Sequence, residues 1–134
     1  TRNISRRYRD FISILIMSLI AKRFEKNDSP YTAEEISEEC QIPIRLTQKA
    51  LYELQEINLL HEVVTDEKSE DIAYQPSMDI NKLNVALLLD RLDTHGSEDF
   101  KIDKDNEFSA QWKALLQARE EYYENASKVL LKDL

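Results

Sequence analysis

The side chains that could carry out catalysis or hold a metal are few, and they are scattered along the chain. The two histidines, His61 and His95, lie far apart and lack the His-x-x-x-His spacing of a zinc site. Cys40 is the only cysteine, which excludes an internal disulfide and a Cys-x-x-Cys metal site. One glycine is too few for a phosphate-binding loop. We therefore expect no catalytic residue, no cofactor and no bound metal.

Two acidic clusters are the remaining candidates for metal-dependent chemistry. The first consists of Glu34, Glu35, Glu38 and Glu39, and the second occupies residues 66–71. Carboxylates that follow one another on a helix point around its cylinder and are readily solvated. We interpret both clusters as solvated surface and not as the Mg²⁺ ligands of a nuclease.

The beginning of the chain is basic, although the protein as a whole is acidic. Residues 1–26 contain seven Lys or Arg and two Asp or Glu, whereas the formal net charge of the whole chain is −8. A basic cluster of this kind is attracted to the phosphates of nucleic acid or of lipid headgroups. Its arginines are Arg2, Arg6, Arg7 and Arg9.

Length and apolar spacing predict a single helix-rich domain. The 134 residues, 42% of them hydrophobic, suffice to close one core. Apolar residues recur every three or four positions through 8–24, which predicts the first helix. Its apolar run, 11–21, is only about half of the ~20 residues that a membrane-crossing helix needs. We therefore expect this helix to belong to the core.

Two shorter helices are expected next. Thr32 and Glu35 have the spacing of a capping box, which predicts that the second helix begins there. It is expected to end near Gln41, and Pro43 suits the first turn of a third helix. Asn58 stands where a left-handed residue would end that third helix. The result is a pair of short helices joined by a turn.

A hairpin and two further helices complete the prediction. Branched residues at 59–64 and 72–76 indicate two strands, and the polar connection 65–71 indicates a long hairpin tip. A fourth helix, capped by Asp79 or Asn81, should run to Thr94 and be stopped by Gly96. After a charged loop, 97–106, helical spacing continues from 107 to 130 in a long amphipathic fifth helix.

This order of elements is typical of a winged helix-turn-helix domain, mainly α with a small β-hairpin. We assign residues 1–96 to that domain. Residues 97–134 supply the loop and the long C-terminal helix that packs on it, all within one structural unit. The fifth helix is expected to pack on the first helix, with Arg119 facing Glu120, Glu124 or solvent. Its aromatic residues could instead form a homodimer seam of Trp112, Tyr122 and Tyr123.

The third helix carries residues that could read DNA. Arg45, Gln48 and Lys49 are expected on its outward face, as base and phosphate contacts require. However, Glu53 and Glu56 lie on the same helix, and the hairpin carries five acidic residues against one lysine, which would repel phosphates. We therefore favour a protein partner and keep nucleic-acid binding as the alternative.

The segments 31–36, 42–43, 51–54 and 58–60 resemble the corresponding pattern of Rrf2-type winged-helix regulators. The resemblance extends over residues 11–94 and implies a DNA-binding transcription regulator. Two departures matter. The hairpin lacks the usual glycines, and Cys40 stands alone where members that sense through an iron-sulfur cluster use several cysteines. Cluster sensing is therefore not expected.

A second resemblance, over residues 4–64, is to the cytoplasmic C-terminal segment of YihY/BrkB-type inner-membrane proteins, a family labelled ribonuclease BN. It rests on residues 5–24 and on the segments 31–36 and 42–46. It implies a non-catalytic binding or regulatory module on the cytoplasmic side of the bacterial inner membrane. The partner would be another protein or the rest of the membrane chain, and the basic cluster would lie near anionic lipid headgroups.

We prefer this membrane-module interpretation to the alternative of a free transcription regulator. A part in a tRNA-processing ribonuclease is less favoured still, because none of the residues considered above supports the ribonuclease label.

Overall fold

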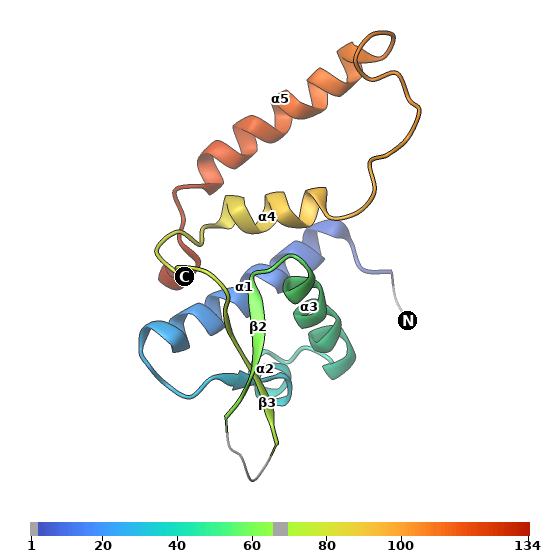
Figure 1. Cartoon of the computed structure of the whole chain (residues 1–134). Coiled ribbons are helices and arrows are strands. Elements are labelled where there is room, and N and C mark those ends of the chain that lie inside the picture. The colour runs from blue at the N-terminus through green and yellow to red at the C-terminus, as the bar shows by residue number, and fades with distance from the viewer. Residues whose placement is uncertain (1–2, 66–69) are drawn as a thin grey trace.

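The computed structural model describes residues 3–65 and 70–134. Over these residues the chain folds into helices, a small antiparallel sheet and a short 3-10 helix (Figure 1). In chain order the elements are α1 (Arg6–Glu25), β1 (Tyr31–Thr32), α2 (Ala33–Cys40), α3 (Ile44–Glu56), β2 (Leu60–Val64), β3 (Ile72–Pro76), α4 (Val85–Thr94), α5 (Ser109–Ala126) and η1 (Leu131–Asp133). The predicted fold class, a mainly helical winged helix-turn-helix with a long C-terminal helix, is confirmed.

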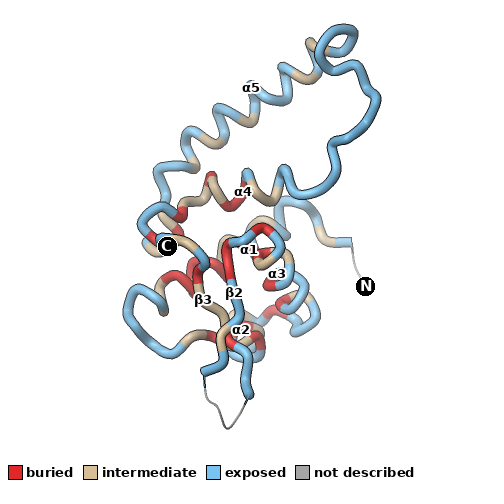
Figure 2. The backbone as a smooth tube through the Cα atoms, in the orientation of Figure 1, coloured by how far each residue is buried: buried red, intermediate tan, exposed pale blue. Residues whose placement is uncertain are grey.

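Helix α1 is the centre of the core. The Ser5 hydroxyl caps its first turn by accepting a hydrogen bond from the Tyr8 amide at 3.1 Å. From the third turn onward its apolar side chains are buried on more than one face, and α3, α4, β3 and η1 all pack against it. Ile16 and Met17 are fully buried. The other elements are thus arranged around α1 (Figure 2).

Capping interactions fix the helix-turn-helix. The Thr32 hydroxyl accepts from the Glu35 amide at 3.2 Å and the Glu35 carboxylate accepts from the Thr32 amide at 2.9 Å, which is the predicted capping box. Gln41 adopts a left-handed conformation, with φ of 57°, and ends α2. Pro43 then precedes the first residue of α3. Asn58, with φ of 61°, turns the chain into β2 as predicted.

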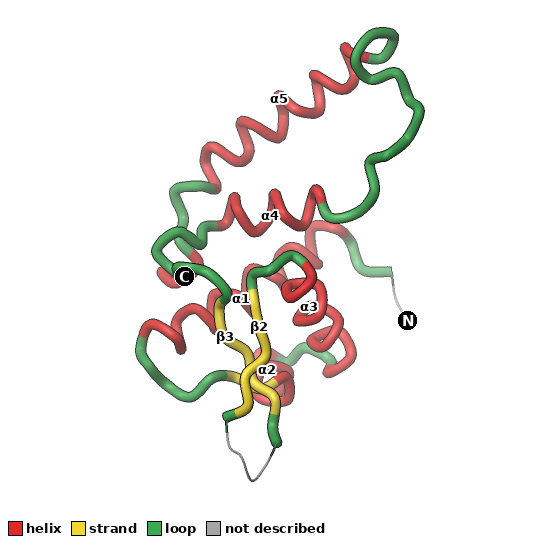
Figure 3. The backbone as a smooth tube through the Cα atoms, in the orientation of Figure 1, coloured by secondary structure: helices red, strands yellow, loops and turns green. Residues whose placement is uncertain are grey.

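The sheet has three strands in the order β1-β3-β2, all antiparallel (Figure 3). β2 and β3 are the predicted hairpin, and they pair from Leu60 opposite Pro76 to Val64 opposite Ile72. The two-residue strand β1 was not predicted, because it is too short to show an alternating pattern. It places Tyr31 opposite Tyr74, which ties the start of α2 to the wing.

Helix α4 begins later than predicted. Its cap is Asn84, whose side chain accepts from the Leu87 amide at 2.8 Å, and not Asp79 or Asn81. Asp79 instead accepts from the Asn81 amide at 2.9 Å in a local turn that precedes the helix. The predicted end at Thr94 is confirmed. Gly96 follows with φ of 134°, a conformation that L side chains rarely adopt.

The C-terminal part differs most from the prediction. Helix α5 ends at Ala126 and has no fully buried residue, and it packs along α4 instead of α1 (Figures 1 and 2). The chain then returns to the body, where the Val85 amide donates to Val129 and the Leu131 amide donates to Leu83. Leu131, on η1, is fully buried against α1 and closes the core that α5 was expected to close.

We expect Leu131→Ala to lower the free energy of unfolding by about 2–5 kcal/mol, because it removes a fully buried side chain and leaves a cavity. Urea denaturation followed by circular dichroism measures the change. Leu134→Ala, three residues later on a side chain that is 51% exposed, is the matched control and should alter stability by less than about 0.5 kcal/mol. Equal effects of the two substitutions would contradict this account of the core.

Candidate nucleic-acid interface

The outward face of α3 brings together the residues that were predicted to read DNA. Arg45, Gln48 and Lys49 are all exposed, whereas Thr47, Leu51 and Leu54 point into the core. At 100° per residue, the three exposed side chains fall within about one third of the helix circumference. They also occupy its first two turns, the part of a recognition helix that enters the major groove.

The two glutamates of α3 are placed differently from the predicted DNA-reading residues. Glu53 is half-buried beside Arg9 and Lys49, where it lines a small cavity between α1 and α3. Glu56 is in the last turn and accepts a hydrogen bond from Tyr52, which raises the pKa of that tyrosine. At 1.5 Å per residue, Glu56 lies about 10 Å further along the axis than Lys49. The acidic charge is therefore concentrated at the C-terminal end of the helix.

Sequence reasoning missed Tyr52 as part of this face. Its side chain is 64% exposed, one of the most exposed large side chains of the described chain. It lies seven residues after Arg45 and three after Lys49, so two helical turns bring it back to the side of Arg45. That seven-residue spacing was the signal that would have found it. A tyrosine here can stack on a base or donate to a phosphate.

The rest of the fold holds α3 at its C-terminal end. The Arg91 guanidinium on α4 donates to the Ile57 carbonyl at 2.9 Å and lies 3.4 Å from the Asn58 carbonyl. A cation at this position also interacts favourably with the negative end of the helix dipole. On the N-terminal turns of α3, the side chains of Arg45, Gln48 and Lys49 stay exposed.

The wing is acidic where the structure describes it. Glu62, Glu70 and Asp71 are exposed on β2, β3 or the adjoining residues. β2 and β3 run towards the end of the molecule opposite α5 (Figure 1). The predicted acidic tip, 66–69, and with it most of the second acidic cluster, lies outside the described residues.

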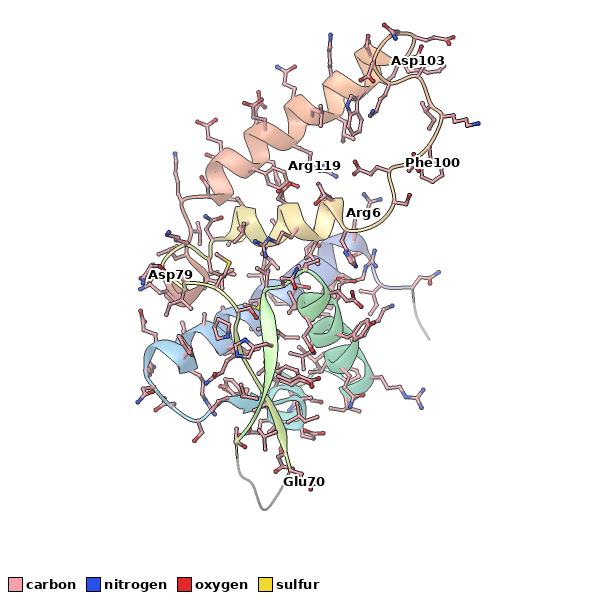
Figure 4. The ribbon with its side chains drawn as sticks, in the orientation of Figure 1. Arg6, Glu70, Asp79, Phe100, Asp103 and Arg119 are labelled. Atoms are coloured by element: carbon pink, nitrogen blue, oxygen red, sulfur yellow. The ribbon has the colours of Figure 1, made fainter. Side chains whose placement is uncertain are left out.

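The basic cluster lines a cavity that lies beside α5, at the end of the molecule opposite the wing. Arg6, Arg7 and Arg9 are exposed on the first turns of α1, and Arg2 lies outside the described residues. The three arginines line a cavity of about 760 Å³ between α1, α4 and α5. In Figure 4, Arg6 lies beside the end of α4, and Arg119 extends from α5 towards α4. Of the three arginines, Arg9 also lines the small cavity between α1 and α3 together with Lys49, so the basic cluster adjoins the outward face of α3 at Arg9.

One carboxylate joins α5 to the body. Asp93, in the last turn of α4, accepts hydrogen bonds from Arg119 and, at 2.6 Å, from the Tyr123 hydroxyl. Burial acts to raise the pKa of Asp93, but the hydrogen bonds from Tyr123 and Arg119, together with the positive charges of Arg119 and Arg6, outweigh it and the pKa is lowered. Burial and the bond to Asp93 raise the pKa of Tyr123. Arg119 thus pairs with a residue 26 positions earlier, and not with Glu120 or Glu124 as expected.

The predicted dimer seam is only partly covered. Trp112 is half-buried, with the Lys104 ammonium 6.0 Å from its ring centre, and Tyr122 is 49% exposed. The rings of Tyr122 and Tyr123 contact each other with centres 5.4 Å apart. Whether this surface forms a seam between two copies stays a prediction at this point.

The histidines and acidic residues were expected to lack metal-binding geometry. His61 is exposed and its Nδ1 lies 3.0 Å from the Ser77 hydroxyl, while His95 lines the cavity beside α5. Within residues 3–65 and 70–134, three or more His, Cys, Asp or Glu side chains do not come together in a group that could hold a metal. In the same part of the chain, every helix is too short or too polar to cross a membrane.

Comparison with known proteins finds similarity to solved structures only. No protein-family model matches the chain, and no curated protein sequence matches it. The fold is similar to that of T. potens IscR, with a TM-score of 0.64 and 14% identity over 98% of this chain and 85% of that chain. It is also similar to CymR (YrzC), the global cysteine regulator of B. subtilis, with a TM-score of 0.64 and 14% identity, over 99% and 95% of the two chains.

A third structure, CymR of Staphylococcus aureus in its oxidized form, gives a TM-score of 0.63 at 15% identity, over 98% of this chain and 94% of that chain. These likenesses support the Rrf2-type part of the sequence resemblance at the level of the fold. They include α5 as well as the winged helix, because they extend over nearly the whole of both chains.

The membrane-module interpretation was wrong. The fold matches the IscR and CymR structures over 98–99% of this chain and 85–95% of theirs, and none of these structures supports a YihY/BrkB origin. The partners derived from that resemblance, a membrane chain and anionic lipid headgroups, and the placement at the inner membrane are left without support.

We expect Asp93→Asn to loosen α5 by roughly 1 kcal/mol, because it removes the charged acceptor for Arg119 and Tyr123 on a partly exposed surface. Hydrogen exchange of the α5 amides should become faster while exchange in α1 is unchanged. Asp90→Asn, on the same helix but without a hydrogen bond to α5, is the control.

The same pair predicts a pH dependence. Since the pKa of Asp93 is lowered in the folded state, its contribution is complete above the pKa of an unfolded aspartate and is lost as the pH falls through the lowered value. Exchange of the α5 amides, corrected for the intrinsic pH dependence of exchange, should therefore rise at acid pH in the native protein. The Asp93→Asn variant should lack this rise; an identical acid response in both proteins would show that Asp93 is not the anchor.

Proposed function

We propose that the protein is a DNA-binding transcription regulator that uses α3 as its recognition helix and binds as a homodimer. The observation that carries the proposal is the outward face of α3, where Arg45, Gln48 and Lys49 are exposed together on its first two turns. The regulator CymR has the same fold, which supports the same kind of activity here.

The acidic residues of α3 and of the wing, which argued against DNA binding in the sequence analysis, are compatible with this proposal. Glu53 lies towards α1, and Glu56 is bonded to Tyr52 in the last turn, so neither occupies the N-terminal part of α3. An acidic wing would be held away from phosphates, leaving α3 as the main contact. A chain with net charge of −8 then has weak non-specific binding, since that binding depends on neutralising phosphates.

A dimer fits the proposal because one short recognition helix reads few bases. Two copies related by a two-fold axis contact two half-sites about 34 Å apart on one side of the duplex. Helix α5, which is exposed and lies on the outer side of α4, can supply the contact between copies and leave the N-terminal turns of α3 free for DNA (Figure 2). Action through binding, with no catalytic step, is part of the same proposal.

Selection from random-sequence duplex oligonucleotides, followed by fluorescence anisotropy on the enriched duplex, tests DNA binding. We expect binding at low micromolar protein that weakens steeply with salt, and an enriched sequence with two-fold symmetry. Arg45→Glu with Lys49→Glu should weaken binding at least about tenfold, because each substitution replaces a phosphate or base contact by a repulsive charge.

Lys26→Glu with Lys101→Glu is the matched control. It changes the net charge by the same amount on exposed residues outside α3, and should leave most of the affinity intact. If the duplex is bound equally well after reversal of Arg45 and Lys49, α3 is not the recognition helix. If no duplex is enriched at low salt, DNA is not the ligand of this protein.

We expect Gln48→Ala to reduce discrimination between sequences more than it reduces affinity for random duplex, because an amide side chain reads a base edge and carries no charge for the backbone. Competition between the enriched duplex and a scrambled one measures the ratio. A uniform loss for both duplexes would assign Gln48 to the backbone instead.

A further inference from the structure

The cavity beside the first turns of α1 has the size of a small-molecule site. It has a volume of about 760 Å³ and lies between α1, α4 and α5. Binding sites for small molecules are hollows of roughly 300–1,000 Å³, mostly apolar, with a few polar groups that converge on the ligand. Arg45, Gln48 and Lys49 do not line this cavity, so a ligand bound in it leaves the proposed DNA-reading face of α3 uncovered.

One part of the lining is apolar. It consists of Leu89 and Leu92 on α4 and of Phe11 and Ile14 on α1. Phe11 is 52% exposed, whereas Ile12 beside it is buried in the core. Removing exposed apolar surface from water is favourable, so this part of the cavity favours a ligand with an apolar group.

A second part of the lining is positively charged. Arg6, Arg7 and Arg9 all line the cavity, and within the described residues none of the three makes an ion pair. Arg9 also lines the small cavity on the α3 side, together with Glu53 and Lys49. Arg6, which lies beside the end of α4 in Figure 4, and Arg7 are the guanidinium groups that remain for a ligand. A guanidinium binds a carboxylate through two parallel hydrogen bonds, so these residues favour a carboxylate ligand.

The cavity also contains a carboxylate without a paired cation. Asp10 is half-buried in the lining, and it makes no ion pair within the part of the chain that the structure describes. Burial raises the pKa of Asp10, and the negative charge of Asp93 raises it further. The charges of Arg9 and Arg6 act in the opposite direction and do not outweigh these causes. An ammonium group beside Asp10 would supply the missing positive charge.

The spacing of these groups on α1 matches the chemistry of one class of ligand. Asp10 lies four residues after Arg6 and three after Arg7, so the carboxylate and the guanidinium groups are neighbours on the surface of the helix. Phe11 lies four residues after Arg7 and places apolar surface beside them. The ammonium and carboxylate groups of an α-amino acid are attached to the same carbon atom, so they need partners that lie this close together.

We propose that the cavity binds a free α-amino acid with a large apolar side chain. Asp10 binds its ammonium group, and Arg6 and Arg7 bind its carboxylate. Its side chain packs between Phe11 and Leu92. The binding itself does not depend on DNA, whereas the use of the amino acid as a regulatory signal rests on the proposed function.

The cavity is placed where a ligand can change DNA binding. The amino acid contacts α1, α4 and α5 at once, and Arg91 on α4 donates to the Ile57 carbonyl at the end of α3. A ligand that binds one arrangement of these helices more tightly than another shifts the affinity for DNA, and DNA shifts the affinity for the ligand by the same factor. Leu115 and Leu116, exposed on α5, do not line the cavity and stay available to the second copy.

Nuclear magnetic resonance of the isotope-labelled protein without DNA tests the site. The probes are L-leucine, L-phenylalanine and L-methionine. At least one of them should shift the amide signals of residues 6–14 and 89–93 and leave those of α2 unchanged, with a dissociation constant of about 1 mM or lower. If none of the three probes moves the signals of residues 6–14, the proposal is wrong.

Analogues of the amino acid that binds test the two charged groups separately. For L-leucine, isoamylamine lacks the carboxylate and N-acetyl-L-leucine lacks the ammonium group, and the corresponding pair serves for each of the other probes. Each analogue should bind at least about tenfold more weakly than the amino acid, because one charged partner in the cavity is left unused. An analogue that binds as tightly as the amino acid would show that the ligand class is wrong.

Single substitutions assign the charged groups to residues. Asp10→Asn should weaken the amino acid at least about tenfold and leave the N-acetyl analogue unchanged, because that analogue offers no ammonium group. Arg7→Gln should weaken the amino acid and leave the amine unchanged. Asp28→Asn and Lys26→Gln, at exposed positions outside the cavity, are the matched controls. Equal losses for the amino acid and the analogue would contradict these assignments, and circular dichroism checks that each variant is folded.

Fluorescence anisotropy on the enriched duplex, with and without the amino acid that binds, tests the regulatory use. We expect the amino acid to change the affinity for DNA at least about fivefold, and Asp10→Asn to remove the change. Amino-acid binding with an unchanged affinity for DNA would overturn the regulatory use and keep the site. Amino-acid binding by a protein that enriches no duplex would overturn the proposed function alone.

Discussion

Burial of Leu131 against α1 is the contact on which the architecture of the C-terminal half depends. It is fully buried, and backbone hydrogen bonds from Val85 to Val129 and from Leu131 to Leu83 hold the segment beside the start of α4. The chain is thereby fixed to the body after α5 as well as before it. Helix α5 is consequently attached to the body of the protein through the segments at both of its ends.

This constraint explains why α5 can be long and yet have no buried residue. The core is already closed by η1, so the apolar side chains of α5 are not needed there. Apart from its ends, the helix is positioned by polar bonds to Asp93. Under the proposed function, the exposed apolar side chains of α5 are available for contact with a second copy.

The elements that local rules define were predictable. The capping box of Thr32 and Glu35, the left-handed Asn58 and the hairpin strands all follow from neighbouring residues. The start of α4 was misplaced because Asp79 also has a capping side chain, which it uses in a local turn. Leu131 continues the apolar spacing of α5, and neither Gly nor Pro marks the break before it, so the sequence alone could not separate η1 from the helix.

The candidate site could be predicted only in part, because only some of its features follow from local rules. The outward positions of Arg45, Gln48 and Lys49 follow from helical periodicity alone. The environments of Glu53 and Tyr52 depend on which neighbours α1 and α3 present to each other, and helical periodicity does not give these. Arg119 was assigned to nearby glutamates because its partner, Asp93, is remote in sequence.

The last turn of α4 makes hydrogen bonds to both α3 and α5. The Arg91 guanidinium donates to the Ile57 carbonyl at the end of α3, and the Asp93 carboxylate, two residues later, accepts from the Tyr123 hydroxyl on α5. Since a helical turn is stiff, these two attachments connect α3, which is proposed to bind DNA, with α5, which is proposed to contact the second copy. In the proposed regulator, this short helical turn is the route by which a displacement of α5 would reach α3.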